Sequence, residues 1–341
     1  MARIREMWRT WSAWTGVMGL TLMAASCIDE DLSDCGKDYQ IVYSLNLHTD
    51  LQTYIGQELT SARERELGKR LKAALSDVFV EHAHDVSLAF YTTDSVCSHY
   101  EEHVPDAASA SFSIYLPVEE YMHLAVANHG VADNGVCMER TDYAPHACVQ
   151  YTAPVSDEMY PSHRTGLFSA RLPMEVSDVN QTFYTNLYMV NSASALVINP
   201  NGVQVNGLEG CVAGTAHCFS VRDSLYTFPA TNLSVCAERL ADTGSQLLCL
   251  YAVSFPSRDV AVRSRAEDEH EAAWQYRVYV TMPDGRVTES VLYVKDPLKA
   301  GRMHIIKASL NDQGGVIPDD PEVGVSIELD WKEGGIFNPE L

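Results

Sequence analysis

The sequence predicts a mainly β protein made of two consecutive β-sandwich domains, the first of which also carries one amphipathic helix. Three observations predict this class. Short runs that alternate apolar and polar residues recur along most of the chain. Turn-forming residues separate many of these runs, without the alternation of strands and helices that is typical of parallel sheets. A helical period occurs strongly only once, near residues 60–80.

The first domain is predicted to begin with a strand followed by this helix. Residues 40–49 alternate, which indicates a half-buried strand. Thr60 or Ser61 can cap the helix, with Glu64 three or four residues further on. Because the apolar stripe is narrow and the opposite face is charged, packing on a sheet is favoured over docking to a membrane or a partner. The stripe consists of Leu67, Leu71, Leu75, Val78 and Phe79.

Further alternating runs predict strands in both halves of the chain. The sequences N-P-N-G at 199–202 and P-D-G at 283–285 indicate turns, the second of them a hairpin. Weak periodicity at 131–165 and a high charge density at 258–271 indicate loops. We therefore expect an N-terminal sandwich over 40–160 and a C-terminal sandwich over 161–341. The predicted strands are 86–93, 110–118, 121–130, 168–176, 182–190, 194–198, 246–255, 274–282, 287–295, 302–310 and 323–331.

The N-terminus has the anatomy of a bacterial lipoprotein signal peptide. Residues 1–9 are basic, and residues 11–25 are uncharged and too short to span a bilayer as a helix. Small residues then lead to Cys27, in a pattern that resembles a lipobox with Ala24 where leucine is usual. We expect residues 1–26 to be removed and Cys27 to be lipidated. The alternative is ordinary cleavage near Ser26, with Cys27 left as a disulfide partner.

Residues 27–39 are expected to form a lipidated acidic tether. Four acidic residues lie within the first seven positions after Cys27, which indicates either a solvated spacer or a surface-export signal like that of Bacteroidales-type lipoproteins. The two acyl chains on one sulfur would suffice for stable anchoring, at about 0.8 kcal/mol for each buried CH₂ group. With such an export signal, the lipid-anchored chain is expected to be exposed at the cell surface.

The composition argues against binding to polyanions. The 341-residue chain has a formal net charge of −22, and the expected signal peptide removes three arginines and only one glutamate. A body this acidic does not attract nucleic acid or anionic lipid electrostatically. The membrane contact is therefore expected to come from the lipid alone, and no nucleic-acid partner is expected.

Eight of the nine cysteines remain once Cys27 is set aside, and in an exported chain they are candidate disulfide partners. They divide evenly between the halves, so disulfides confined to each half are possible. Eight cysteines allow 105 pairings, among which the sequence does not choose, and free buried thiols are the alternative. The candidates are Cys35, Cys97, Cys137 and Cys148, followed by Cys211, Cys218, Cys236 and Cys249.

The sequence contains no recognisable catalytic constellation. The patterns G-x-S-x-G, H-E-x-x-H and the P-loop are absent. The tripeptide His82–His84, followed by Asp85, resembles part of a metal site but has no third ligand at a recognisable spacing. Cys211, His217 and Cys218 could be drawn as zinc ligands, although disulfides are favoured in an exported chain. No catalytic residue, metal or other cofactor is expected.

Both ends of the mature chain contain distinctive stretches. At the start, Cys27, an acidic segment and Cys35 precede the first strand. At the end are residues 298–310 and the stretch V-G-V-S-I-E-L-D-W-K-E-G-G at 323–335. These stretches resemble the start of the mature chain and the closing strands of the FimB-like minor fimbrillins, the anchor subunits of Bacteroidales-type fimbriae. The middle of the chain matches in layout more than in residues. The resemblance implies two transthyretin-like sandwiches, outer-membrane lipid anchoring, and no enzymatic activity.

The expected function is to anchor a fimbria and to pair with fimbrial subunits by β-strand addition. An alternative is a surface lipoprotein that binds glycans through Trp274, Tyr276 and Tyr279, although the first two share a strand face and are expected to pack in a core. An exported hydrolase is disfavoured, because no nucleophile, base and orienting group occur together. Trp331 and the pair Gly334–Gly335 are interpreted as a strand end and a turn.

Overall fold

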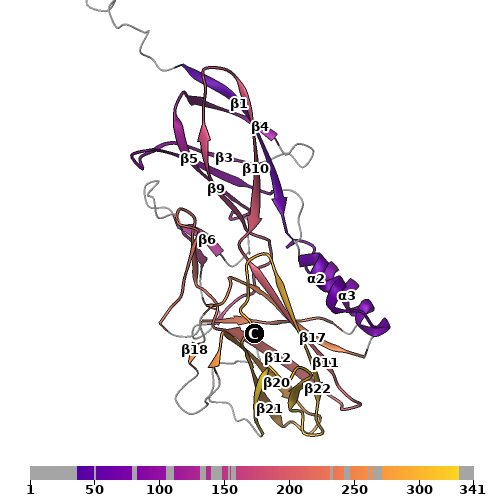
Figure 1. The fold of residues 1–341 in the computed structure, drawn as a ribbon. Coiled ribbons are helices and arrows are strands. Elements are labelled where there is room, and N and C mark those ends of the chain that lie inside the picture. Colours follow the sequence, from indigo (N-terminus) through magenta and orange to yellow (C-terminus); the bar gives the residue numbers. More distant parts are fainter. Residues whose placement is uncertain are drawn as a thin grey trace, which may run out of the picture.

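The computed structural model is an elongated, mainly β molecule in which two β-sandwiches follow one another along the long axis (Figure 1). Two helices lie against the side of the second sandwich. The structure describes residues 37–49, 51–78, 83–104, 111–130, 136–139, 148–152, 154, 159–230, 233–241, 246–259, 262–263 and 271–329.

The first sandwich is a seven-stranded sheet that folds back on itself. Its strand order is β3-β2-β5-β9-β10-β1-β4, and β9 and β10 are joined by only two residue pairs. The layer β3-β2-β5-β9 therefore faces the layer β10-β1-β4. The strands are β1 Asp38–His48, β2 Val86–Thr92, β3 Cys97–His103, β4 Ser111–Pro117, β5 Glu120–Ala127, β9 Phe168–Glu175 and β10 Gln181–Met189.

A buried histidine joins the two layers of this sandwich. His123 on β5 stacks on Phe90, with 4.5 Å between the ring centroids. Its Nε2 lies 2.6 Å from the hydroxyl of Tyr43 on β1, in the opposite layer. Burial lowers the pKa of His123 to about 4, and the hydrogen bond to the Ala89 carbonyl opposes this only in part. The core is thus built around a neutral imidazole.

The second sandwich packs a five-stranded sheet against a six-stranded one. The first has the order β16-β17-β11-β22-β23 and the second β24-β21-β20-β12-β15-β8. Apolar side chains from both sheets, including the fully buried Leu250 and Tyr276, fill the space between them. The strands are β8 Met159–Tyr160, β11 Ser192–Asn199, β12 Gly207–Ala213, β15 Ser234–Cys236, β16 Glu238–Arg239, β17 Leu248–Ser254, β20 Trp274–Thr281, β21 Val287–Val294, β22 Met303–Leu310, β23 Val316–Pro318 and β24 Gly324–Glu328.

Both turns that the sequence predicts are present. Gly285 has φ +85°, and it closes the hairpin in which Thr281 of β20 pairs with Val287 of β21. At the other turn, Asn201 and Gly202 have positive φ, and the Val203 N–H donates to the Pro200 carbonyl at 2.8 Å. These positions favour glycine and asparagine because other side chains are strained there.

Two smaller sheets complete the described part of the chain. One has the order β14-β13-β7-β6, and the other pairs β18 with β19. The prediction that 131–165 is a loop is therefore wrong for β6, β7 and β8, whose two to four residues are too short to show a period. These strands are β6 Val136–Glu139, β7 Cys148–Tyr151, β13 Cys218–Ser220, β14 Leu225–Thr227, β18 Val262–Arg263 and β19 Glu271–Ala272.

The division between the sandwiches differs from the predicted boundary at residue 160. Strands β9 and β10 lie beyond that boundary, yet they pair with β5 and β1 of the first sandwich. Conversely, β7 and β8 lie before it and pair with β13 and β15. The pairing of β1 with β10 joins residues about 140 positions apart, and nothing local in the sequence signals it. By strand pairing, the chain contributes β8 to the second sandwich, returns to the first for β9 and β10, and continues in the second after β10.

The predicted helix is present as α3, Ala62–Ala74, and it packs on a sheet as expected. Ser61 is its N-cap: Ser61 Oγ accepts a hydrogen bond from the Glu64 N–H, and the Glu64 carboxylate accepts one from the Ser61 N–H at 2.8 Å. Leu67 and Leu71 are fully buried against the outer face of the sheet that contains β11, β17 and β22. The helix from the first half therefore covers the second sandwich (Figure 1).

A second helix, α2 at Leu51–Glu58, precedes α3 and was not predicted. With eight residues it is too short to show a clear helical period. Lys307 on β22 joins both helices to the sheet, since its Nζ donates to the Glu58 carbonyl and lies 2.8 Å from Glu64 Oε1. Burial acts to raise the pKa of Glu64, but the hydrogen bonds from Lys307 and Ser61 outweigh it and lower the pKa to about 2.

Candidate interaction surface

Strand β4 is an open edge of the first sandwich. It stands last in the strand order, and among the described residues it pairs only with β1. Its side chains alternate strictly: Ser111, Ser113 and Tyr115 are exposed, while Ile114 and Leu116 are buried. The inward side chains hold the strand in place, so its outer edge is presented on a rigid support.

The register shows which main-chain groups of β4 face outward. The Gln40 N–H of β1 points away from β4, because it donates to Asn180 Oδ1 at 3.1 Å. Successive residues of a strand direct their main-chain groups to alternate neighbours. Ile41 therefore faces β4 and its partner Ile114, which leaves the N–H and C=O of Ser113 and Tyr115 on the open side. These groups are the ones that an added strand would pair with.

The opposite end of this sheet is protected in a way that β4 is not. Strand β3 carries Glu101 and Glu102, and its pairing with β2 is interrupted by a bulge between Phe90 and Tyr91. Charges and bulges are common devices against edge-to-edge association. Strand β4 has neither, and its only proline is the last residue, Pro117. Of the two edges, β4 is the one suited to accept a strand.

The solvent-facing side of β4, β1 and β10 forms an exposed aromatic surface, which we call the tyrosine face. It is defined by Tyr115, Tyr184, Tyr188 and Val42, which are 53%, 77%, 57% and 39% exposed. Hydrogen-bonded amides lie among them, as where Asn46 Nδ2 donates to Asn186 Oδ1 at 3.2 Å.

The tyrosine face carries no charge. The outward-facing residues of β1 from Gln40 to His48, and their described pairing partners on β4 and β10, include no Asp, Glu, Lys or Arg. In a chain of net charge −22, an uncharged aromatic surface next to an open edge is a candidate docking site.

Comparison with known proteins identifies the fold. No family model and no curated protein sequence matches the chain. Among solved structures, a candidate adhesin from Bacteroides thetaiotaomicron superposes with a TM-score of 0.51 at 11% identity, over 84% of this chain and 95% of that one. The two proteins share a fold.

Two other structural neighbours superpose with lower TM-scores. One is the fimbrial anchor protein Mfa2 from Porphyromonas gingivalis, with a TM-score of 0.47 and 9% identity over 86% of this chain and 99% of that one. A fimbrial assembly protein from Parabacteroides distasonis has a TM-score of 0.41 and 11% identity over the same shares.

Several residues singled out from the sequence lie outside the described part of the chain. These are Cys27 and Cys35 of the expected tether, His82, and Trp331 with Gly334–Gly335.

Asp85, which follows the histidine motif, lies in the described part. Its carboxylate accepts hydrogen bonds from the N–H groups of His129 and Gly130. Asp85 therefore acts as a cap for a turn. Among the described residues, no group of three His, Cys, Asp or Glu could hold a metal ion, and no helix is long and apolar enough to cross a membrane.

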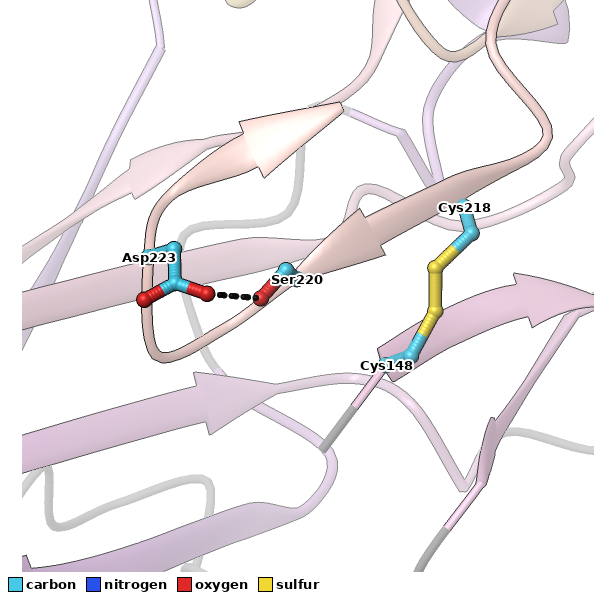
Figure 2. The surroundings of a disulfide bond; sticks show 4 residues. All are labelled: Cys148, Cys218, Ser220 and Asp223. Carbon is cyan, nitrogen blue, oxygen red and sulfur yellow. Dashed lines mark hydrogen bonds between the residues drawn. A yellow bond between two sulfur atoms is a disulfide. The ribbon is translucent and has the colours of Figure 1, made fainter. Parts of the chain in front are cut away.

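Two of the candidate cysteines form a disulfide that crosses between the predicted halves. Cys148 on β7 is bonded to Cys218 on β13, with 6.2 Å between their Cα atoms (Figure 2). The β13–β14 turn beside the bond is closed by a hydrogen bond from Ser220 Oγ to Asp223. The possibility of disulfides confined to each half does not hold for this pair, because β7 pairs with β13 of the second half. Cys218 is consequently not a zinc ligand.

The remaining described cysteines are not bonded in the structure. Cys97 and Cys137 are half-buried on β3 and β6. Cys249 is buried under the helices, where burial raises its pKa to about 12. Cys211 and Cys236 lie on adjacent strands, a placement considered further below.

The aromatic residues considered for glycan binding are unsuited to it. Trp274 and Tyr276 are 0% exposed and pack in the core of the second sandwich, as their shared strand face indicated. Tyr279 is half-buried, and its hydroxyl donates to Glu289 at 3.1 Å. The exposed tyrosines of the first sandwich, which the sequence did not single out, replace them as the candidate aromatic platform.

A pocket of about 620 Å³ lies between the first sandwich and the β13–β14 turn. Apolar side chains of β5, including Met122 and Leu124, line it together with Arg171 and Arg222. Glu120 and Glu175, which pair across β5 and β9, lie in the same pocket. The described lining of the pocket includes no histidine or cysteine.

Proposed function

We propose that this chain is a non-enzymatic anchor or minor subunit of a fimbria, tethered to the outer membrane by lipid on Cys27. In this proposal a fimbrial subunit joins it by adding a strand along β4. The observation that carries the proposal is the open, uncharged edge of β4, where no other strand of the described residues pairs with the main-chain groups of Ser113 and Tyr115. The shared fold with a candidate adhesin and the resemblance at both ends of the chain support the fimbrial setting.

Strand addition suits the chemistry of this edge. An incoming strand would extend the layer β10-β1-β4 by forming main-chain hydrogen bonds with outward-facing groups. Each such bond contributes about 0.5–1.5 kcal/mol net. Side chains of the added strand would alternate between the sandwich interior and the tyrosine face, and this alternation supplies specificity. Because β4 is uncharged, the incoming strand meets no electrostatic barrier at the edge itself.

Anchoring through Cys27 fits the position of the first strand. The tether, predicted over residues 27–39, leads directly into β1, which begins at Asp38 and lies next to β4 in the sheet. The attachment point to the membrane and the strand-accepting edge would therefore belong to the same sandwich. A load applied by the fimbria would pass through β4 and β1 to the lipid without crossing the second sandwich.

The proposal is tested by a crosslinked pull-down from the native outer membrane, with mass spectrometry of the bound proteins. A series of polymeric β-sandwich subunits should co-purify with the wild-type chain. Cys27→Ala should release the protein from the membrane or leave an uncleaved precursor. Recovery of the chain alone would contradict the fimbrial role, and unchanged flotation of the Cys27→Ala variant with the outer membrane would contradict the lipid anchor.

The tyrosine face favours one alternative, which is glycan binding at the cell surface. Exposed aromatic rings next to side-chain amides are suited to stacking on sugar rings and to hydrogen-bonding their hydroxyls. The test is a glycan array with the wild type and with the double variant Tyr184→Ala/Tyr188→Ala. Micromolar binding that the double variant loses would favour this alternative, whereas an array without binding would remove it.

A further inference from the structure

Two cysteines that the structure leaves unbonded lie directly opposite each other in the second sandwich. Cys211 on β12 and Cys236 on β15 are register partners in an antiparallel pair. Their neighbours Val212 and Val235 are fully buried in the core between the sheets. Because side chains alternate along a strand, both cysteines project from the other face of the same sheet.

The hydrogen bonds around this pair show which kind of cross-strand position it occupies. The Ala237 N–H donates to the Gly210 carbonyl at 2.8 Å, and the Gly214 N–H donates to the Leu233 carbonyl at 3.1 Å. Hydrogen-bonded and non-hydrogen-bonded pairs alternate in an antiparallel ladder. Cys211 and Cys236 therefore form a non-hydrogen-bonded pair, in which Cα atoms are about 4.5 Å apart and side chains are closest.

This placement satisfies the requirements of a disulfide between Cys211 and Cys236. A Cα separation of about 4.5 Å lies inside the range of about 4.4–6.8 Å that disulfides span. Cys249 is the other buried cysteine of this sandwich, but it lies on the helix-covered face of the opposite sheet. The core of the sandwich separates it from Cys211. Cys218 is already bonded to Cys148.

We propose that Cys211 and Cys236 form a second disulfide of this chain in its exported form. The bond would join the two ends of the chain segment that leaves this sheet after β12 and returns to it as β15. The same segment contains β13 and β14, and the Cys148–Cys218 bond joins β13 to β7. The segment's turn also supplies Arg222 to the pocket described above. Two bonds, one between β12 and β15 and one between β13 and β7, would restrain this segment at two places.

The reaction that forms the bond requires a disulfide oxidant, for which glutathione disulfide is a defined example. One cysteine thiolate attacks the oxidant and gives a mixed disulfide and one released thiol. The second cysteine then attacks the mixed disulfide through its thiolate, forms the Cys211–Cys236 bond, and releases the second glutathione thiol. Two electrons and two protons pass to the oxidant, so the exchange is balanced. This inference does not depend on the fimbrial role.

Peptide mapping tests the proposal with the full mature chain, either exported or folded in the presence of glutathione disulfide. Free thiols are alkylated under denaturing conditions without reduction, because burial raises the pKa of Cys211 to about 12 and would slow alkylation of the folded chain. The protein is then digested and its peptides are identified by mass spectrometry. The expected result is a linked pair of peptides that contain Cys211 and Cys236, which reduction separates.

Matched variants test whether the bond restrains the segment between β12 and β15. Cys236→Ser should leave Cys211 as a new alkylated thiol and should accelerate limited proteolysis between β12 and β15 severalfold, while Cys249→Ser should change neither. Recovery of Cys211 and Cys236 as alkylated thiols in most of the oxidised wild-type protein would overturn the proposal. So would a link from either residue to a different cysteine.

Discussion

His123 is expected to make the stability of this protein fall as the pH falls below neutrality. Its ring is buried in the first sandwich, stacked on Phe90 and hydrogen-bonded to Tyr43, and its pKa is lowered to about 4. In the unfolded chain the ordinary value of 6.5 applies. A base whose pKa is depressed on folding stabilises the fold above its unfolded pKa, and this stabilisation is lost as the pH falls from 6.5 to 4.

The size of the effect follows from the shift. Each unit of pKa difference corresponds to about 1.36 kcal/mol, so His123 accounts for about 3 kcal/mol across the whole window and about 2.5 kcal/mol by pH 4.5. His123→Gln keeps a polar, hydrogen-bonding side chain that does not titrate. The free energy of unfolding of this variant should therefore fall less between pH 7 and pH 4.5 than that of the wild type, by about 2.5 kcal/mol.

The measurement is urea unfolding followed by tryptophan fluorescence, at pH 7 and at pH 4.5, for both proteins. Comparing each protein with itself at two pH values removes the constant cost of the substitution. Leu71→Ala serves as a control, because the cost of its cavity should be the same at both pH values. Equal acid losses in the wild type and in His123→Gln would refute the conclusion that a neutral imidazole is part of this core.

Three further perturbations test contacts between segments from the two halves of the chain. The double variant Cys148→Ser/Cys218→Ser should lose about 4 kcal/mol in urea unfolding, because the bond spans a sequence separation of 70 residues; a loss below about 1 kcal/mol would contradict a native bond. Leu71→Ala should cost about 3 kcal/mol through the cavity left under α3, and a cost like that of a surface substitution would mean that the helix is not docked. Lys307→Met should lower the free energy of unfolding by about 1 kcal/mol at pH 7. The loss should be smaller below pH 4.5, because the Glu64 carboxylate then protonates and the stabilisation linked to its low pKa disappears in the wild type as well. The comparison requires unfolding curves at pH 7 and pH 3, and a difference that grows in acid would contradict the contact.

The parts of the fold that local patterns encode were predictable. Alternation over 40–49 predicted β1, the sequence from Ser61 to Glu64 predicted the start of α3, and the P-D-G turn predicted the hairpin of β20 and β21. The shared strand face of Trp274 and Tyr276 indicated core packing, which their complete burial confirms. In each case neighbouring residues carry the whole signal.

The parts that depend on long-range pairing were not predictable. The boundary at residue 160 was wrong because β1 pairs with β10, and no local pattern links Leu45 to Thr185. Alternation in β4 showed that Ser113 and Tyr115 share a face, but it does not reveal whether another strand covers their edge. The candidate interaction surface emerges only when the strand order is known. The tether and Cys27 lie outside the described residues and remain predictions from the sequence.

The central claim is that β4 accepts a strand, and a proline at its open edge tests this claim most directly. Ser113→Pro removes an outward N–H while leaving the ladder to β1 intact, since prolines are tolerated where the N–H faces away from the sheet. Ser113→Ala is the matched control, because it loses the same contact from Gln40 Nε2 to Ser113 Oγ but keeps the N–H.

The measurement is the yield of fimbrial subunits in the crosslinked outer-membrane pull-down, for two variants whose melting temperatures match the wild type. The account predicts wild-type yield with Ser113→Ala and a loss of about tenfold or more with Ser113→Pro. Equal yields from both variants would contradict strand addition at β4.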